Sequence, residues 1–330
     1  MTGGRRRAAV LWSGTAVALV LLIVASLAIG AVPLAPGDVL RALGGQGDAM
    51  SITIVRELRL PRVVLAMLVG CALGGSGAAL QGTLRNALAE PYLLGVSGGA
   101  AVGAVLAMTI GITGAASVPL MAFAGAMAAV LLVLALARAA GGARDPRMLL
   151  MAGVIIGAFA NAMILILLAD VSPERVRGAM WWMAGSLTDA SWIRVTWLAV
   201  YVAVGMMLLY TRGRLLDVLA LGDESAAALG ADVAGMTRQV FLISALLAAA
   251  SVAAAGLIGF VGLVVPNIVR AFGIVRHRAL ILSAAAGGAA LLLFADLLAR
   301  TVRAPVELPI GAITALIGVP VFLARLRRIR

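Results

Sequence analysis

Long runs of apolar residues, separated by short segments that carry the charges, extend along the whole chain. A helix needs about 20 mainly apolar residues to cross the hydrocarbon core of a bilayer, so each run of this length predicts one membrane span. Cutting the runs at arginines and at glycine or proline turns gives about ten spans. The predicted spans are residues 10–32, 63–83, 91–111, 118–137, 148–169, 194–211, 238–257, 259–272, 279–297 and 308–325. The segment 259–272 is short, and the pattern leaves open whether it crosses the membrane fully.

The composition agrees with a chain that lies almost entirely in lipid. Hydrophobic residues make up 63% and charged residues 12% of the 330 positions, and the mean hydropathy is +1.11. A soluble domain carries roughly a quarter charged residues. The first apolar run, from Ala8 to Gly37, is longer than the roughly 7 to 15 residues of a signal-peptide core, so we expect a retained first helix. The sequence therefore predicts an all-α membrane protein with a single transmembrane domain over residues 1–330, folded as one helical bundle.

The charge is strongly positive, with 26 basic residues against 14 acidic residues and a formal net charge of +12. The basic residues are all arginines that sit between apolar runs and form no stripe along one helix, which argues against nucleic acid as a partner. If successive spans cross in alternate directions, most arginines fall on the side that holds both termini. Because cytoplasmic loops are enriched in arginine and lysine, both termini are expected in the cytoplasm and the chain in the inner (plasma) membrane.

Several functional classes lack the residues that they require. The 14 acidic residues fall in loops or near span ends, which disfavours an ion-coupled secondary transporter with a buried carboxylate. No HExxH, GxSxG or Walker A motif occurs, so the chain is expected to be no enzyme and to leave ATP hydrolysis to a separate subunit. The chain has a single cysteine, Cys71, and a single histidine, His277, which we interpret as a solvated loop residue. With so few possible ligands, we expect no metal site and no cofactor. A secondary transporter and a membrane receptor without transport activity remain alternatives.

Four stretches stand out from the apolar background. The first joins RLPR at 59–62 to QGTLRNALAEP at 81–91 and LGVSGGA at 94–100, and the second is LALGDESAAALG at 219–230. The third is GLIGFVGLVVPNIVR at 256–270, and the fourth contains ADLLAR at 295–300, PVELPIG at 305–311 and GVP at 318–320. In this order and spacing the four stretches resemble the permease family of importers for iron-siderophores, haem and vitamin B12, the type II ABC importers.

This resemblance implies a permease subunit that forms a translocation pathway as a homodimer. The implied partners are a second copy of the chain, two cytoplasmic ATP-binding subunits and an extracytoplasmic substrate-binding protein. An iron chelate (siderophore or haem) is expected as cargo because that cargo is commonest in the family, and cobalamin is the alternative. Ala87 and Asn267 depart from the family pattern, which usually has proline and histidine at these positions. The two departures question the local geometry of the gate and leave family membership intact.

The loop at 219–230 has the features of a short cytoplasmic helix. Asp223, Glu224 and Ser225 can cap its N-terminus and complement its dipole, and Gly230 can end it in a left-handed conformation. An ordinary connecting loop is the simpler interpretation. The resemblance implies that this segment is the coupling helix that transmits force from the ATPase. The coupling residues expected are Leu219, Leu221, Gly222, Asp223, Glu224, Ser225, Leu229 and Gly230.

The resemblance also assigns three further groups of residues. Arg59, Arg62 and Arg300, at span ends on the outer side, are expected to dock carboxylates of the binding protein, because a planar guanidinium can hold a carboxylate with two hydrogen bonds; membrane-interface anchors are the alternative. The expected cytoplasmic gate consists of Asn86, Leu88, Asp145 and Pro146. The pathway is expected to be lined by Met148, Met151, Asn161 and Thr314 on spans 148–169 and 308–325, although packing is the more common role of methionine.

Overall fold

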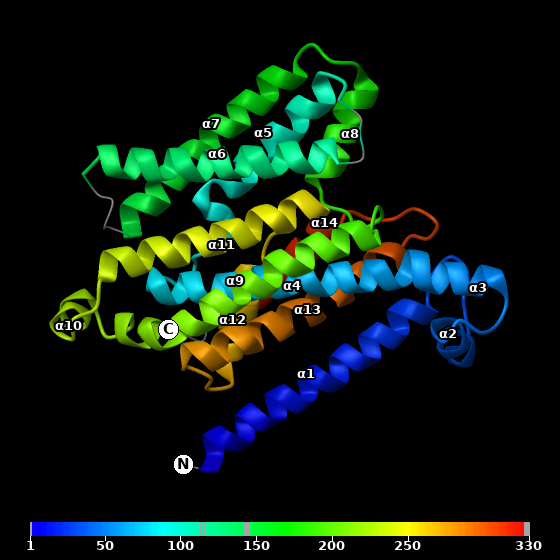
Figure 1. The fold of residues 1–330 in the computed structure, drawn as a ribbon, viewed down its shortest axis with the longest axis horizontal. Coiled ribbons are helices and arrows are strands. Elements are labelled where there is room, and N and C mark those ends of the chain that lie inside the picture. Colours follow the sequence, from blue (N-terminus) through cyan, green and yellow to red (C-terminus); the bar gives the residue numbers. More distant parts are fainter. Residues whose placement is uncertain (1, 113, 115, 142–145, 327–330) are drawn as a thin grey trace.

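The structure is a computed structural model that describes residues 2–112, 114, 116–141 and 146–326, and all regular elements in these ranges are helices (Figure 1). Seven helical segments are long and apolar enough to cross a membrane. They contain α1 (Thr2–Ala28), α4 (Leu60–Thr83), α6 (Ser117–Ala139), α7 (Pro146–Leu168), α9 (Trp192–Leu219), α11 (Val233–Ala255) and α13 (His277–Thr301). Three shorter apolar helices are α5 (Val96–Thr109), α12 (Val261–Ala271) and α14 (Ile310–Leu326). The protein is therefore a multi-pass helical membrane protein, as the sequence predicted.

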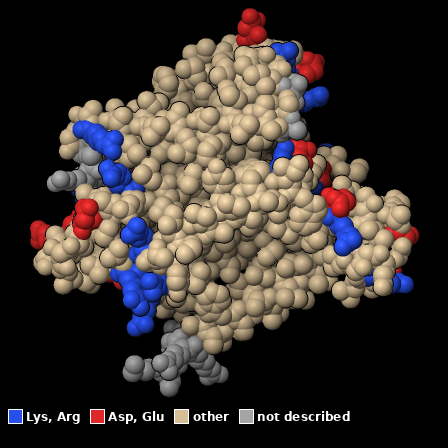
Figure 2. All heavy atoms as spheres, viewed as in Figure 1, with Lys and Arg blue, Asp and Glu red and all other residues tan. Residues whose placement is uncertain are grey.

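The helices lie side by side in one bundle with two charged ends. The beginning of α1 and the short helix α10 lie at one end, and α2 and α3 lie at the other (Figure 1). Charged side chains gather at these two ends, with a broad uncharged band between them (Figure 2). The remaining short helices are α2 (Pro36–Leu43), α3 (Ala49–Thr53), η1 (Ile54–Arg59), η2 (Pro91–Leu94), α8 (Pro173–Met183) and α10 (Asp223–Ala228). The uncharged band is what a bilayer requires of a lipid-facing surface.

Several helix bounds differ from the predicted spans because arginines do not stop a helix. The helix predicted to start at 63 is continuous from Ala49 through Thr83 and includes the π-helical turn η1. The helix predicted over 194–211 extends to Leu219, beyond the charged residues that bounded the prediction. Helix α8 was not predicted, since its sequence carries charges and lacks the length of a span. Charge therefore marks where a span leaves the hydrocarbon core and does not mark where its helix ends.

The predicted span 259–272 contains a helix that is too short to cross a bilayer. Helix α12 has 11 residues, which at 1.5 Å per residue gives about 16 Å, roughly half of the ~30 Å hydrocarbon core. The preceding residues 257–259 have no regular secondary structure. Backbone without helical hydrogen bonds is tolerated at membrane depth only where it is buried in protein, so this segment must find its partners inside the bundle.

Helix α4 occupies the centre of the bundle and contacts α9, α11, α12 and α13. Small residues allow the closest of these contacts. A Cβ atom added to Gly70 would lie 2.3 Å from the backbone oxygen of Gly288, and one added to Gly74 would lie 2.2 Å from that of Ala284. Such backbone contact is typical of helices that associate in lipid, where apolar burial provides little driving force. The small residues at positions 70 and 74 therefore serve helix packing.

Substitution at this contact should destabilise the bundle. Gly74→Ala would place its methyl group against backbone that cannot rotate away, and overpacking of this kind costs about 1–3 kcal/mol. Gly157→Ala is the matched control, because a Cβ atom there would meet no heavy atom within 4 Å. Thermal unfolding of both variants in detergent checks the prediction. Equal melting temperatures for the two variants would contradict the central role of the α4–α13 contact.

Candidate coupling, gate and outer charge sites

Two arginines with largely buried side chains hold the end of α1, at the end of the bundle where α2 and α3 lie. The Arg59 guanidinium donates hydrogen bonds to the backbone oxygens of Leu27, at 2.6 Å, and Ala28, at 3.0 Å, and also to that of Val32. Arg300 donates to the oxygens of Ile29, at 2.8 Å, and Ser26, at 2.7 Å. The last carbonyls of a helix lack partners within the helix and attract positive charge. Arg59 and Arg300 therefore cap the C-terminus of α1.

Arg62 connects α4 to two carboxylates, one in α13 and one in the loop after it. Its guanidinium bonds both oxygens of Glu307, at 2.8 and 2.9 Å, and Asp296, at 2.9 Å from Nε. Asp296 is fully buried and also lies 3.4 Å from Arg300. The hydrogen bonds from Arg62, helped by that from Thr188, hold the pKa of the Glu307 carboxyl below its ordinary value. The pairing explains how a buried carboxylate is tolerated beside the hydrocarbon core.

Arg59, Arg62 and Arg300 are largely buried within this chain, and their predicted docking of a binding protein stays a prediction. Arg59 is only 8% exposed, and the side chains of Arg62 and Arg300 are 12% and 9% exposed. Their donors already face oxygens of this chain, because a charge at the border of the bilayer must be paired. The sequence contained a signal of this pairing, because Asp296 and Arg300 are four residues apart in one helix and can form an ion pair. The exposed arginines at this end include Arg56 and Arg303.

The expected coupling helix is present but shorter than residues 219–230. Helix α10 covers Asp223–Ala228, Leu219 is a buried residue of α9, and Gly230 has the expected left-handed conformation with φ +79°. The predicted side-chain cap is wrong: the N-cap is Gly222, with φ +105° and no side-chain hydrogen bond. Leu221 and Leu229 are 65% and 68% exposed. Glu224 and Ser225 are exposed as well, so α10 presents two leucines and polar side chains outward.

Asp223 makes an ion pair where a cap was expected. Its carboxylate accepts a hydrogen bond from Arg85 at 2.6 Å. Arg85 belongs to the segment 84–90 that follows α4, and it has a positive φ of 47°, uncommon for a residue with a side chain. The coupling helix is thus joined directly to the first predicted gate segment, a contact across 138 residues that sequence reasoning did not find.

The gate segment 84–90 is also bonded to α12 at two points. The Asn267 amide donates to the backbone oxygen of Ala87 at 3.0 Å and to that of Leu263 at 2.8 Å. At the other end of the segment, Glu90 accepts the backbone N–H of Phe260 at 2.6 Å, which satisfies an unpaired donor at the start of the short helix. The two positions that depart from the family pattern, 87 and 267, therefore contact each other.

The two halves of the predicted gate differ in what the structure shows of them. The Asn86 side chain accepts the backbone N–H of Leu88 at 2.9 Å and fixes a tight turn, and Leu88 is 49% exposed at its tip. Asp145 lies outside the described residues, and Pro146 is described only as the first residue of α7. The structure therefore brings Asn86 and Leu88 together and says nothing of their approach to Asp145.

The predicted pathway residues fall on both exposed and buried faces. Met151 and Asn161 are exposed on α7, and Met148 is half-buried. Thr314 was expected to line the pathway, but it is fully buried and donates to Gly311 of its own helix at 3.0 Å. Its face of α14 packs inside the bundle, while large apolar side chains such as Leu316 point outward. The assignment of Thr314 is therefore corrected.

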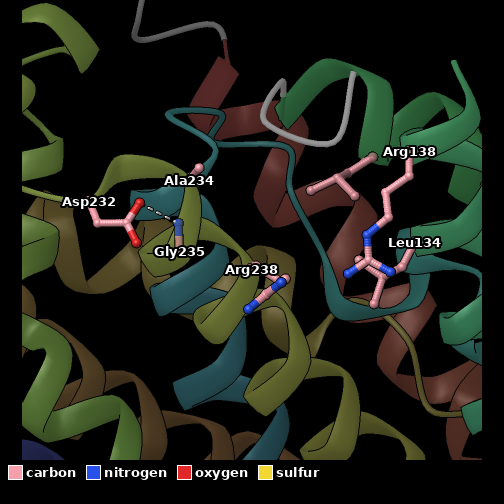
Figure 3. Close-up of a pocket in the computed structure, with 7 residues that line it drawn as sticks. Leu134, Arg138, Asp232, Ala234, Gly235 and Arg238 are labelled. Atoms are coloured by element: carbon pink, nitrogen blue, oxygen red, sulfur yellow. Dashed lines mark hydrogen bonds between the residues drawn. The ribbon is translucent and has the colours of Figure 1, made fainter. Parts of the chain in front are cut away.

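A pocket of about 290 Å³ lies beside the coupling helix, between α6, α7 and α11 (Figure 3). Arg138 of α6 and Arg238 of α11 line it from opposite sides, and Leu134 and Leu149 supply apolar surface. Both arginines are exposed. The carboxylate of Asp232 accepts the backbone N–H of Gly235 at 2.9 Å and caps α11. The pocket therefore offers two guanidinium groups to an acidic partner.

His277 is not the solvated loop residue that the sequence suggested. It is 6% exposed at the start of α13, and the Oδ1 atom of Asp217 lies 2.9 Å from its backbone nitrogen and 2.8 Å from its Nδ1. Its ring packs against Gly82 of α4, where an added Cβ atom would lie 2.3 Å from Nε2. Among the described residues, no group of three or more His, Cys, Asp or Glu side chains is placed to hold a metal ion.

Comparison with known proteins agrees with these elements. The FecCD transport family matches residues 18–328. The hemin transport system permease protein HmuU of Yersinia pestis is 40% identical over 81% of each chain. The vitamin B12 import system permease protein BtuC of Citrobacter koseri is 37% identical over 97% of this chain and 94% of its own. The iron(3+)-hydroxamate import system permease protein FhuG of Bacillus subtilis is 34% identical, over 92% and 93%.

A solved structure has the same architecture. It shows an inward-facing conformation of a metal-chelate type ABC transporter, with a TM-score of 0.87 and 29% sequence identity, over 97% of this chain and 99% of the other. The alignment therefore covers nearly the whole of both chains. The chain therefore belongs to the FecCD transport family and is the membrane-spanning permease component of an ABC importer.

Proposed function

We propose that two copies of this chain form the translocation pathway for an iron chelate, siderophore or haem, in the inner membrane. The proposal of a dimer rests on an exposed polar side chain on the outward face of α7. Asn161 is exposed there among apolar residues such as Val154 and Leu165. An amide that faced lipid would lose its hydrogen bonds with water at a cost of several kcal/mol, so a partner or a water-filled pathway is expected to cover this face.

The proposed orientation places α10 and both termini in the cytoplasm, with ten crossings. They include α5, α14 and one crossing that α12 makes only together with the non-helical residues before it. The excess of arginines at the α10 end supports this orientation. Two separate ATP-binding subunits would then bind at α10 through Leu221 and Leu229, with an acidic group of the ATPase in the pocket between Arg138 and Arg238. An extracytoplasmic protein would deliver the cargo at the other end, where Arg56 and Arg303 are exposed.

Force from the ATPase would reach the gate through a short series of contacts. The Arg85–Asp223 ion pair connects α10 to segment 84–90, and Asn267 connects that segment to α12. A displacement of α10 would therefore move Leu88 and the cytoplasmic end of α12 together. The relatives support an iron chelate or cobalamin as cargo, and we propose the chelate because haem and iron-hydroxamate permeases are both among them.

Transport in reconstituted vesicles tests the proposed function. Vesicles that contain the chain, its ATP-binding subunits and its binding protein should take up a ferric hydroxamate or haem when ATP is present on the α10 side. Uptake of cobalamin should be slower, and an ion gradient without ATP should drive none. Uptake driven by the gradient alone would favour a secondary transporter, and preferred uptake of cobalamin would replace the proposed cargo.

Exchange of the charges in the ion pair tests the coupling route. Arg85→Asp should lower the amount of cargo moved per ATP, because like charges then face each other where α10 meets the gate segment. The double variant Arg85→Asp with Asp223→Arg restores opposite charges and should recover coupling. ATPase rate and uptake are measured together in vesicles. Normal coupling in the single variant, or no recovery in the double variant, would contradict the route.

Loss of Arg62 should lower the free energy of unfolding of the chain. Arg62→Met leaves the carboxylate of Asp296 buried without its main partner, and removal of one partner from a buried pair costs about 3–5 kcal/mol. The matched control is Arg303→Met, an exposed arginine of the same outer end, for which a change within about 0.5 kcal/mol is expected. Chemical unfolding in detergent measures both variants. A stable Arg62 variant that no longer binds the binding protein would support the docking role of Arg62.

A further inference from the structure

A deep groove lies at the outer end of the bundle, away from the coupling and gate sites. Helix α11 runs between α6 and α9 (Figure 1), and both pack against it. The groove has a volume of about 780 Å³, within the range of pockets that hold small molecules. A smaller hollow of about 230 Å³ adjoins it and shares Pro119, Asp189, Arg194 and Ala253 with it. The two hollows therefore form one site with a narrow and a wide part.

The part shared by the two hollows carries one charge of each sign. Asp189 comes from the loop before α9, and Arg194 comes from the first turn of that helix. Within the residues that the structure describes, neither side chain makes an ion pair or a side-chain hydrogen bond, with the other or with any third group. A carboxylate and a guanidinium that stay apart in one pocket leave both charges free for a ligand with an anionic and a cationic group.

The wide part of the groove is apolar and is bordered by exposed apolar side chains. Phe123 of α6 and Tyr201 of α9 meet across it with ring centroids 5.7 Å apart, and Trp197 packs edge-on against Tyr201 at 6.1 Å. Leu120 and Ile193 at its rim are 64% and 80% exposed. Tryptophan and tyrosine are typical of the depth at which lipid head groups meet acyl chains. The apolar surface thus starts next to the charged part and continues along two membrane-spanning helices.

We propose that this groove binds a phospholipid with a zwitterionic aminoethyl head group, of the phosphatidylethanolamine class. The phosphate lies against the Arg194 guanidinium, the ammonium group donates hydrogen bonds to Asp189, and one acyl chain occupies the apolar groove along Phe123 and Trp197. A purely anionic lipid is disfavoured by the carboxylate of Asp189. A choline head group has no N–H with which to donate to that carboxylate. The site is independent of the cargo and of the ATPase contacts.

Quenching of tryptophan fluorescence by brominated lipids tests the proposal. A variant that keeps Trp197 and has phenylalanine at Trp12, Trp181, Trp182 and Trp192 is reconstituted in nanodiscs with brominated phosphatidylethanolamine, phosphatidylcholine or phosphatidylglycerol. The ethanolamine lipid should reach half-quenching at about a fivefold lower mole fraction than the other two, as expected for contacts the size of a surface ion pair. In Asp189→Asn and Arg194→Gln that preference should disappear.

The control is Arg303→Gln, which removes an exposed arginine of the same outer end that does not line the groove and should keep the preference. Equal quenching by the three lipids, a preference for phosphatidylglycerol, or a preference that survives both groove variants would overturn the proposal. If the Trp197 variant does not fold, native mass spectrometry of the unmodified chain and of Asp189→Asn gives the same decision. The unmodified chain should then retain phosphatidylethanolamine through detergent exchange, and the variant should lose it.

Discussion

Direct backbone contact between α4 and α13 is the constraint on which the rest of the bundle depends. In lipid, burial of leucine against leucine gains little over burial of leucine in acyl chains, so helices associate through close packing and polar contacts. Gly70 and Gly74 allow the backbone of α4 to touch that of α13, and Gly77 does the same toward Gly262 of α12. Because α4 is thereby fixed at the centre, the positions of α9 and α11 depend on the faces of α4 that α12 and α13 do not cover.

Polar groups at the edges of the bundle are satisfied by that same central helix. Arg59 and Arg62 stand at the N-terminal end of α4, where they hold the carbonyls of α1 and the carboxylates of the α13 end. At its other end, Gln81 donates to the backbone oxygen of Gly262 at 3.1 Å and accepts a hydrogen bond from Arg270. Charges beside a hydrocarbon core persist when each one has a partner, which explains why arginines that seem exposed in the sequence lie inside.

The backbone around α12 is interrupted, and the proposed coupling route runs through this part of the bundle. Segment 84–90 and residues 257–260 leave the helical hydrogen-bonding pattern, and their polar groups are satisfied by Glu90, Asn267 and Tyr92 from within the bundle. These hydrogen bonds are few and specific, in contrast to the continuous packing of α4 on α13. A segment held in this way can be displaced without unfolding its neighbours, and Arg85 connects it to the coupling helix on the surface. The groove at α9, proposed to bind a lipid, lies outside this series of contacts.

The sequence by itself determined the class of the protein, most of its spans and its family, because hydropathy, span length and motif order are local properties of the chain. Residue type also determined that Gly230 would adopt a left-handed conformation. Only the tertiary structure decided what each charged or polar side chain contacts. Arg59 and Arg300 cap α1, Asp223 pairs with Arg85, His277 is buried beside Asp217 and Thr314 faces inward. The partners of these side chains come from segments far away in the chain, and a pattern read along one helix contains no information about which distant helix end will lie beside it.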